Sequence, residues 1–212
     1  MILQAYHSMY EGTPVFFFDE IQNVEGWANF ARRLAESVMQ PCSLNRLCNL
    51  VKSTGTSCST STIMEYVRYL QESCLLMSID NYASKFVEKE TVKKHYFVDN
   101  GLLHLFINNP DTLLLENLCA ITLYKRYDGG LYYYNRNVEV DFYVPEEGLA
   151  IQASYRMSDT DTLEREIKAL VVLHSIHPLS KAMIITYEDE ETIERDGLEI
   201  EVVPIWKWIL EG

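Results

Sequence analysis

The pattern that constrains this chain most is a pair of neighbouring segments in which apolar and polar residues alternate. Residues 138–144 (VEVDFYV) and 149–155 (LAIQASY) both alternate, and residues 145–148 (PEEG) lie between them. Strand side chains point to opposite faces in turn, so each segment predicts a half-buried β-strand. The four intervening residues are typical of a hairpin loop. One face of the first strand is expected to be apolar, with Val138, Val140, Phe142 and Val144.

The loop length also predicts the pairing of this hairpin. If the residues that flank the loop pair with each other, Asp141 lies opposite Gln152, and Glu139 lies opposite Ser154. Cross-strand neighbours have Cβ atoms about 4.5–5.5 Å apart. The polar side chains of the hairpin are therefore expected to form one cluster.

A further carboxylate is expected to reach this cluster from a helix. Residues 113–127 are apolar on nearly every side of a helix, which predicts a buried helix, and Glu116 lies within it. A buried carboxylate is costly unless it is paired or bound to a metal. The oxygen ligands of Glu116, Asp141 and Gln152 would suit Mg²⁺ or Mn²⁺.

The rest of the C-terminal half predicts a mixed α/β layer. Helical and strand periodicities indicate helix 161–174, strands 182–187 and 199–204, and a closing helix 206–210. Trp206 and Trp208 are expected to straddle that last helix, with one side packed and the other exposed. The acidic run 188–191 is interpreted as a solvated loop.

At the other end of the chain, a short apolar strand is followed by two carboxylates. Residues 15–18 (VFFF) precede Asp19 and Glu20, and a helix is expected over 27–39. This arrangement indicates a nucleotide-hydrolysing site, in which the aspartate holds Mg²⁺ and the glutamate orients water. The sequence VFFFDEIQNVEGW resembles the Walker B region of AAA-type ATPases of bacteria and archaea that carry a C-terminal domain of unknown function. No G-x-x-x-x-G-K-[ST] loop is present, so we expect no ATP hydrolysis.

Residues 41–98 predict a winged helix-turn-helix, as the ATPase family has at this place. Ser43 is expected to cap a first helix, residues 60–72 form a second, and strands at 75–79 and 95–98 form the wing. A DNA-binding interpretation would use Arg68, Lys93 and Lys94 as the phosphate or base contacts. The alternative is packing or protein contact, because phosphate binding normally needs several basic residues.

The C-terminal segments LLENL, EVDFYV and AIQAS resemble the PD-(D/E)XK restriction-endonuclease-like fold. The resemblance implies that Glu116 is the helix glutamate, Asp141 the metal-binding aspartate and Gln152 the (D/E) residue. Ser154 then stands at the position of the catalytic lysine. A serine cannot supply that cation, although Lys168 or Arg165 on the following helix could replace it. The alternatives are a metal-free polar core, a metal site without catalysis and a working nuclease.

The net charge and the cysteine pattern narrow the classes of partner and the cell compartment that we expect for this protein. The chain has a net charge of −13, and residues 139–212 carry 17 acidic and 6 basic residues, a net of −11. Such a surface repels phosphate backbones. Five cysteines without a C-x-x-C pair indicate reduced thiols in a cytoplasmic protein, and no apolar stretch is long enough to cross a membrane.

Together these patterns predict an α+β and α/β chain with three parts. Residues 1–40 would be an ATPase remnant, 41–98 a winged-helix domain, and 99–212 an endonuclease-like mixed sheet flanked by helices. The predicted function is that of a degenerate, non-enzymatic family member, which acts through a protein partner or self-association. A metal-dependent nuclease and a winged-helix DNA-binding protein are the alternatives.

Overall fold

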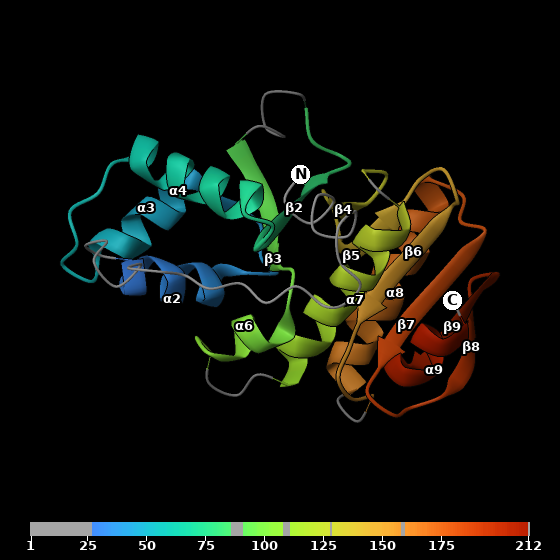
Figure 1. Cartoon of the computed structure of the whole chain (residues 1–212). Coiled ribbons are helices and arrows are strands. Elements are labelled where there is room, and N and C mark those ends of the chain that lie inside the picture. The colour runs from blue at the N-terminus through green and yellow to red at the C-terminus, as the bar shows by residue number, and fades with distance from the viewer. Residues whose placement is uncertain (1–26, 86–90, 108–110, 128, 158–159, 212) are drawn as a thin grey trace, which may run out of the picture.

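A computed structural model describes residues 27–85, 91–107, 111–127, 129–157 and 160–211. The predicted strand at 15–18, with Asp19 and Glu20, lies outside these residues. Over the described residues, helices flank a nine-stranded mixed sheet (Figure 1), whose strand order is β1-β3-β2-β4-β5-β6-β7-β9-β8. The mixed α/β class expected from the sequence is therefore confirmed.

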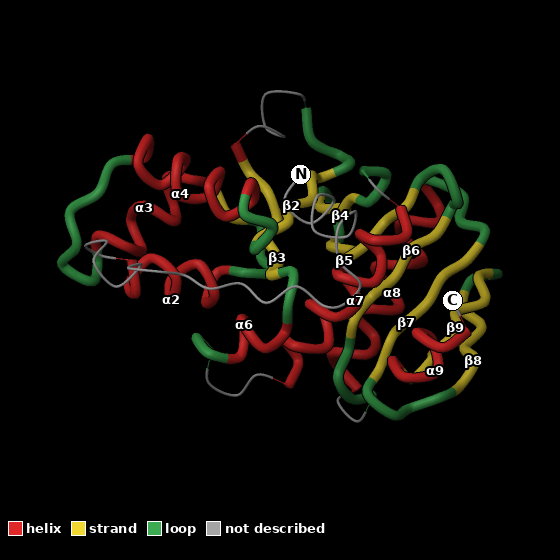
Figure 2. Tube along the Cα trace, in the orientation of Figure 1, coloured by secondary structure: helices red, strands yellow, loops and turns green. Residues whose placement is uncertain are grey.

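The N-terminal elements are three helices, which lie beside one end of the sheet (Figure 2), and three strands of the sheet. They are α2 (Trp27–Ser37), β1 (Cys42–Ser43), α3 (Leu44–Lys52), α4 (Thr60–Glu72), β2 (Leu76–Asn81) and β3 (Val92–Phe97). The Ser43 hydroxyl accepts a hydrogen bond from the Arg46 N–H, and Ser59 caps α4 in the same way. These caps satisfy N–H groups that have no partner inside the helix, which explains where the two helices begin.

The C-terminal elements continue the same sheet. They are α6 (Asn100–His104), α7 (Asp111–Tyr127), β4 (Tyr132–Asn135), β5 (Glu139–Val144), β6 (Leu149–Ala153), α8 (Thr160–Ile176), β7 (Lys181–Thr186), β8 (Glu191–Arg195), β9 (Leu198–Pro204) and α9 (Ile205–Glu211). Strand β2 pairs in parallel with β4 through Asp80–Tyr132 and Asn81–Tyr133. The domain boundary predicted at residues 98 and 99 thus falls inside one continuous sheet.

Helices cover both faces of the C-terminal strands. Helices α7 and α9 pack in one apolar cluster with Ile151 and Met183, whereas α8 packs in a second cluster with Ala150 and Ile184. Residues adjacent in a strand point to opposite faces, so the two clusters lie on opposite sides of the sheet. Trp208 is 6% exposed and Trp206 is 59% exposed, which confirms the predicted two-sided character of the last helix.

The predicted hairpin register is confirmed. Val144 pairs with Leu149, and Phe142 pairs with Ile151, in an antiparallel ladder between β5 and β6. Residues 145–148 form the turn that joins the two strands. Asp141 and Gln152 are therefore neighbours, as the loop length indicated.

The predicted single apolar face of the first hairpin strand is wrong. The partners of β5 along β4 shift by one residue between Val140 and Tyr143, so Asp141 and Phe142 together lie opposite one residue. Val140 packs in the cluster under α8, whereas Phe142 packs in the cluster under α7. This two-against-one pairing is a β-bulge, which interrupts the alternation and redirects the side chains beside it.

Two smaller features differ from what the local sequence suggests. Asp99-Asn100-Gly101 is typical of a turn in composition, but Asp99 caps the short helix α6 by accepting a hydrogen bond from the Leu102 N–H. The acidic run 188–191 is not entirely a loop, because Glu191 begins β8 and pairs with Val202. Four of the five β8 residues are exposed, so a strand at the sheet edge resembles a polar loop in composition.

Candidate functional site

A buried lysine lies at the centre of the predicted carboxylate cluster. The side chain of Lys94 on β3 is 1% exposed. Its Nζ lies 3.0 Å from Asp141 Oδ1, 2.9 Å from Glu139 Oε1 and 3.7 Å from Glu116 Oε1. Three elements far apart in sequence, β3, β5 and α7, thus meet at one ammonium group.

The burial of Lys94 overturns its predicted place on an exposed DNA-binding wing. Strand β3 begins at Val92, before the predicted start at His95, so Lys94 lies within the sheet. Residues Lys94 and Tyr96 are two apart and share a face of the strand. Because its Nζ is surrounded by carboxylates, Lys94 is not available to a phosphate.

Neighbouring polar residues fix the position of Glu116 above β3. The Tyr96 hydroxyl donates a hydrogen bond of 2.9 Å to Glu116 Oε1. The next residue on α7, Asn117, is fully buried; its amide accepts from the Phe97 N–H and donates to the Phe97 carbonyl, each at 2.9 Å. These contacts bind α7 to β3 and hold the glutamate over the lysine.

The electrostatics of the cluster follow from its burial. Burial, followed by the charge of Asp141, raises the pKa of Glu116 well above its ordinary value, against the opposing effect of Lys94. Burial alone would lower the pKa of Lys94, but Asp141, Glu116 and Glu139 outweigh it and raise that pKa. The ammonium of Lys94 therefore stays charged, and the carboxyl of Glu116 takes up a proton more readily than an exposed glutamate does.

The Gln152 side chain hydrogen-bonds to the backbone of the hairpin, so its oxygen is not free to bind a metal ion. It is 1% exposed. Its Oε1 accepts from the Asp141 N–H at 2.8 Å, and its Nε2 donates to the Glu139 carbonyl at 2.9 Å. In return, Asp141 Oδ2 accepts from the Ala153 N–H at 3.1 Å. Side chains thus continue the bonding between β5 and β6 beyond Phe142–Ile151, the last backbone pair of that ladder.

Neither Ser154, which was predicted at the position of the catalytic lysine, nor the two basic residues predicted to replace that lysine supplies the cation of the cluster. The Ser154 hydroxyl donates to the Arg156 carbonyl at 3.4 Å, and among the described residues no hydrogen bond joins it to Glu139. Arg165 on α8 pairs with Glu166 at 2.7 Å. Lys168 lines a separate pocket, described below. The cation in the cluster therefore comes from β3, a strand that sequence reasoning did not connect with the site.

The predicted metal ligands do not fit a divalent cation as they are arranged. Both Asp141 oxygens and the Gln152 amide already have partners, and the Lys94 ammonium stands among the carboxylates. Across the part of the chain that the structure describes, no three His, Cys, Asp or Glu side chains form a group suited to a metal ion. The set of Glu116, Asp141 and Gln152 as metal ligands remains a prediction.

The remaining predicted DNA contacts each face a carboxylate. Arg68 lies 3.8 Å from Glu72 on α4, with both side chains largely exposed. Lys93 lies 2.9 Å from Asp80 on the neighbouring strand. Both residues are thus paired with carboxylates that do not belong to the cluster around Lys94.

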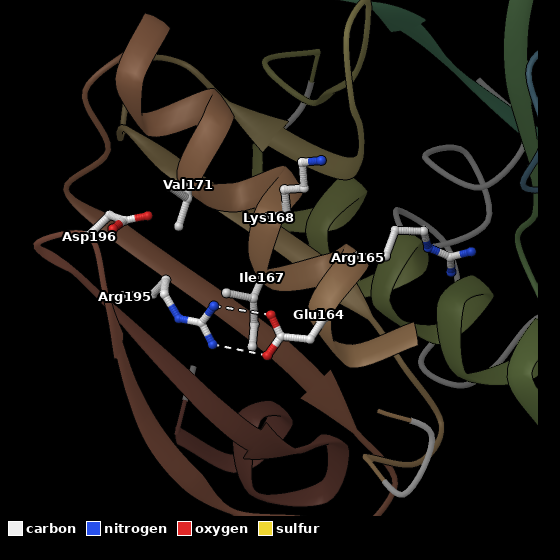
Figure 3. Close-up of a pocket in the computed structure, with 7 residues that line it drawn as sticks. All are labelled: Glu164, Arg165, Ile167, Lys168, Val171, Arg195 and Asp196. Atoms are coloured by element: carbon white, nitrogen blue, oxygen red, sulfur yellow. Dashed lines mark hydrogen bonds and ion pairs between the residues drawn. The ribbon is translucent and has the colours of Figure 1, made fainter. Parts of the chain in front are cut away.

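A pocket of about 400 Å³ lies between α8 and the β8–β9 hairpin. Figure 3 shows the Arg195 guanidinium paired with both oxygens of Glu164, while Arg165 points away from that pair. Lys168 and Val171 also line the pocket. Its charged groups are exposed, and Arg195 and Glu164 pair with each other, so it is a weaker candidate site than the buried cluster.

The chain is thus a mixed α/β protein with a lysine–carboxylate cluster between its sheet and helix α7. The chain belongs to the family described as Domain of unknown function (DUF8612), which matches residues 6–113. It is 34% identical over 181 residues to an uncharacterized protein of Methanocaldococcus jannaschii. That match covers 79% of this chain and 40% of the relative, so the chain spans about two fifths of the relative's length. No solved structure matches the chain.

The helices give no sign of a membrane span. No helix within the described residues is both long enough and apolar enough to cross a bilayer.

Proposed function

We propose that this chain is a degenerate, non-enzymatic member of an ATPase-derived family and that it acts through protein contacts. In this proposal the carboxylate cluster is a structural core without a metal. The observation that carries it is the Lys94 ammonium, which lies 2.9–3.0 Å from Glu139 and Asp141. A lysine in that place supplies the positive charge that a metal ion would otherwise provide.

The order of elements supports an endonuclease-like ancestry. Helix α7 is followed by the antiparallel strands β4, β5 and β6, then by α8 and by β7, which pairs in parallel with β6. That is the succession expected from the PD-(D/E)XK resemblance. Likewise, the two helices α3 and α4, followed by the antiparallel strands β2 and β3, support a winged-helix ancestry for residues 41–98.

Protein contact is supported by apolar side chains left exposed on α9. Trp206 is 59% exposed and Leu210 is 79% exposed. They are four residues apart and lie on the same side of the helix, with Ile209 beside them. We propose that a second copy of the chain binds this side of α9.

Calorimetric titration with Mn²⁺ tests the metal-free core. We expect no binding to the unmodified protein at millimolar Mn²⁺, and no cleavage of single-stranded, duplex or branched DNA. The matched comparison is Asp141→Ala, which should behave identically in both assays. Binding that Asp141→Ala abolishes would contradict the metal-free core, and metal-dependent cleavage lost in the same variant would establish the nuclease alternative.

Light scattering tests self-association through α9. The unmodified chain should show a mass near twice its 24.6 kDa, and replacing Trp206 and Leu210 together by serine should give the monomer mass. Met64 on α4 is also apolar and 53% exposed, so Met64→Ser is the control and should leave the mass unchanged. A monomeric unmodified protein would reject the second copy as the partner.

A further inference from the structure

Two cysteine thiols that the carboxylate cluster does not involve are in direct contact. Cys48 Sγ on α3 lies 3.5 Å from Cys58 Sγ, which precedes the cap of α4. Each thiol also lies near the other residue's carbonyl, with Cys48 Sγ at 3.7 Å from the Cys58 oxygen and Cys58 Sγ at 3.6 Å from the Cys48 oxygen. Both cysteines are free thiols.

The surroundings of the pair favour closure of a bond between the sulfurs. A disulfide needs a sulfur–sulfur distance of about 2.05 Å, so the two atoms must approach by roughly 1.5 Å. The segment between them contains Gly55 at φ +85°, with nothing within 4 Å of an ideal Cβ. Cys58 is partly exposed, whereas Cys48 is buried, so an oxidant in solution reaches Cys58 first.

We propose that Cys48 and Cys58 are a peroxide-oxidised pair that forms a reversible disulfide between α3 and the start of α4. The Cys58 thiolate attacks one oxygen of hydrogen peroxide and breaks the O–O bond, which gives a sulfenic acid and a hydroxide ion. The hydroxide takes up the proton that the thiol released on ionisation and becomes one water. The Cys48 sulfur then attacks the Cys58 sulfur and displaces the hydroxyl group, which leaves as a second water with the thiol proton. Two thiols supply the two electrons that reduce one peroxide.

The consequence is a covalent link within the helical end of the molecule. The bond closes a loop of about ten residues, and closing such a loop restricts the unfolded chain. Burial and the neighbouring Cys48 thiol raise the pKa of Cys58. Because the thiolate is the reactive form, oxidation should be faster at pH 9 than at pH 7.

The experiment treats the whole chain with hydrogen peroxide at pH 8.5 and counts thiols after denaturation. Of the five cysteines, three should remain reactive, and peptide mapping should recover a cross-linked pair containing Cys48 and Cys58. The melting temperature should rise by about 5 °C, and dithiothreitol should reverse the rise. Cys58→Ser should give neither the cross-linked peptide nor the rise in melting temperature. Cys74→Ser, at another partly exposed cysteine, should give both.

The proposal is overturned by any of three results. The pair could remain fully reduced while peroxide is in excess, the mapped link could join a different pair or two chains, or the oxidised sulfurs could be recovered only as sulfinic acids. Peptide mapping distinguishes these results in the unmodified protein, so the test does not depend on how well any variant folds.

Discussion

Replacing Lys94 by methionine should destabilise the protein by about 3–5 kcal/mol, because it removes the positive partner of Asp141 and Glu116, two largely buried carboxyl groups. Methionine retains much of the side-chain volume, so the loss is electrostatic rather than a packing defect. Asp141 and Glu116 are 16% and 12% exposed, and water cannot fully solvate them in the absence of the ammonium. Urea unfolding followed by circular dichroism measures the effect.

The neighbouring lysine provides the control for this experiment. Lys93 pairs with Asp80 at 2.9 Å, but about a third of each side chain is exposed. Lys93→Met should therefore cost less than about 1 kcal/mol. Adding Asp141→Asn to Lys94→Met should recover part of the stability, because it removes one of the unpaired charges. Equal effects of the two lysine replacements would show that the cluster contributes little to the stability of the fold.

Replacing Gln152 by glutamate should cost about 2–4 kcal/mol in the free energy of unfolding. The change removes the Nε2 donor, so a carboxylate oxygen faces the Glu139 carbonyl at hydrogen-bonding distance. It also adds a negative charge at a buried position next to Asp141. Chemical unfolding of the variant and of the unmodified protein gives the difference.

The same variant separates the structural and nuclease interpretations. In the PD-(D/E)XK resemblance a glutamate at position 152 restores a metal ligand, so Mn²⁺ should bind and stabilise the variant. In the structural interpretation the variant is less stable with or without Mn²⁺. Asn135→Asp is the matched amide-to-acid control, because Asn135 Nδ2 donates to Glu139 Oε2 at 3.4 Å near the surface. We expect less than about 1 kcal/mol there.

The hairpin could be predicted from the sequence because its signals are local. Alternation over 149–155 and a four-residue loop were enough to predict the register that pairs Val144 with Leu149. The β-bulge could not be predicted in this way, since it depends on how β5 pairs with β4. The alternation of residues 138–144 is real in the sequence, but one extra residue at Asp141 places Val140 and Phe142 on opposite sides of the sheet.

The identity of the central cation depended on contacts between distant segments. Glu116 and Asp141 lie in one cluster, but the lysine that joins them lies 47 residues before Asp141. The sequence contains one indication of this lysine: Lys94 is two residues before Tyr96, so both side chains lie on the same face if the strand begins before Lys94. Since the strand was expected to begin at His95, that signal was interpreted as part of an exposed wing.

The parallel pairing of β2 with β4 bears on how such a chain can change over evolutionary time. The carboxylates of Glu116, Glu139 and Asp141 lie after residue 98, while the lysine that balances them lies before it. A recombination event that exchanged either half for an unrelated segment would leave unbalanced charge in the interior and an open sheet edge at β2 or β4. The two halves are therefore expected to be inherited together, as one unit rather than as interchangeable modules.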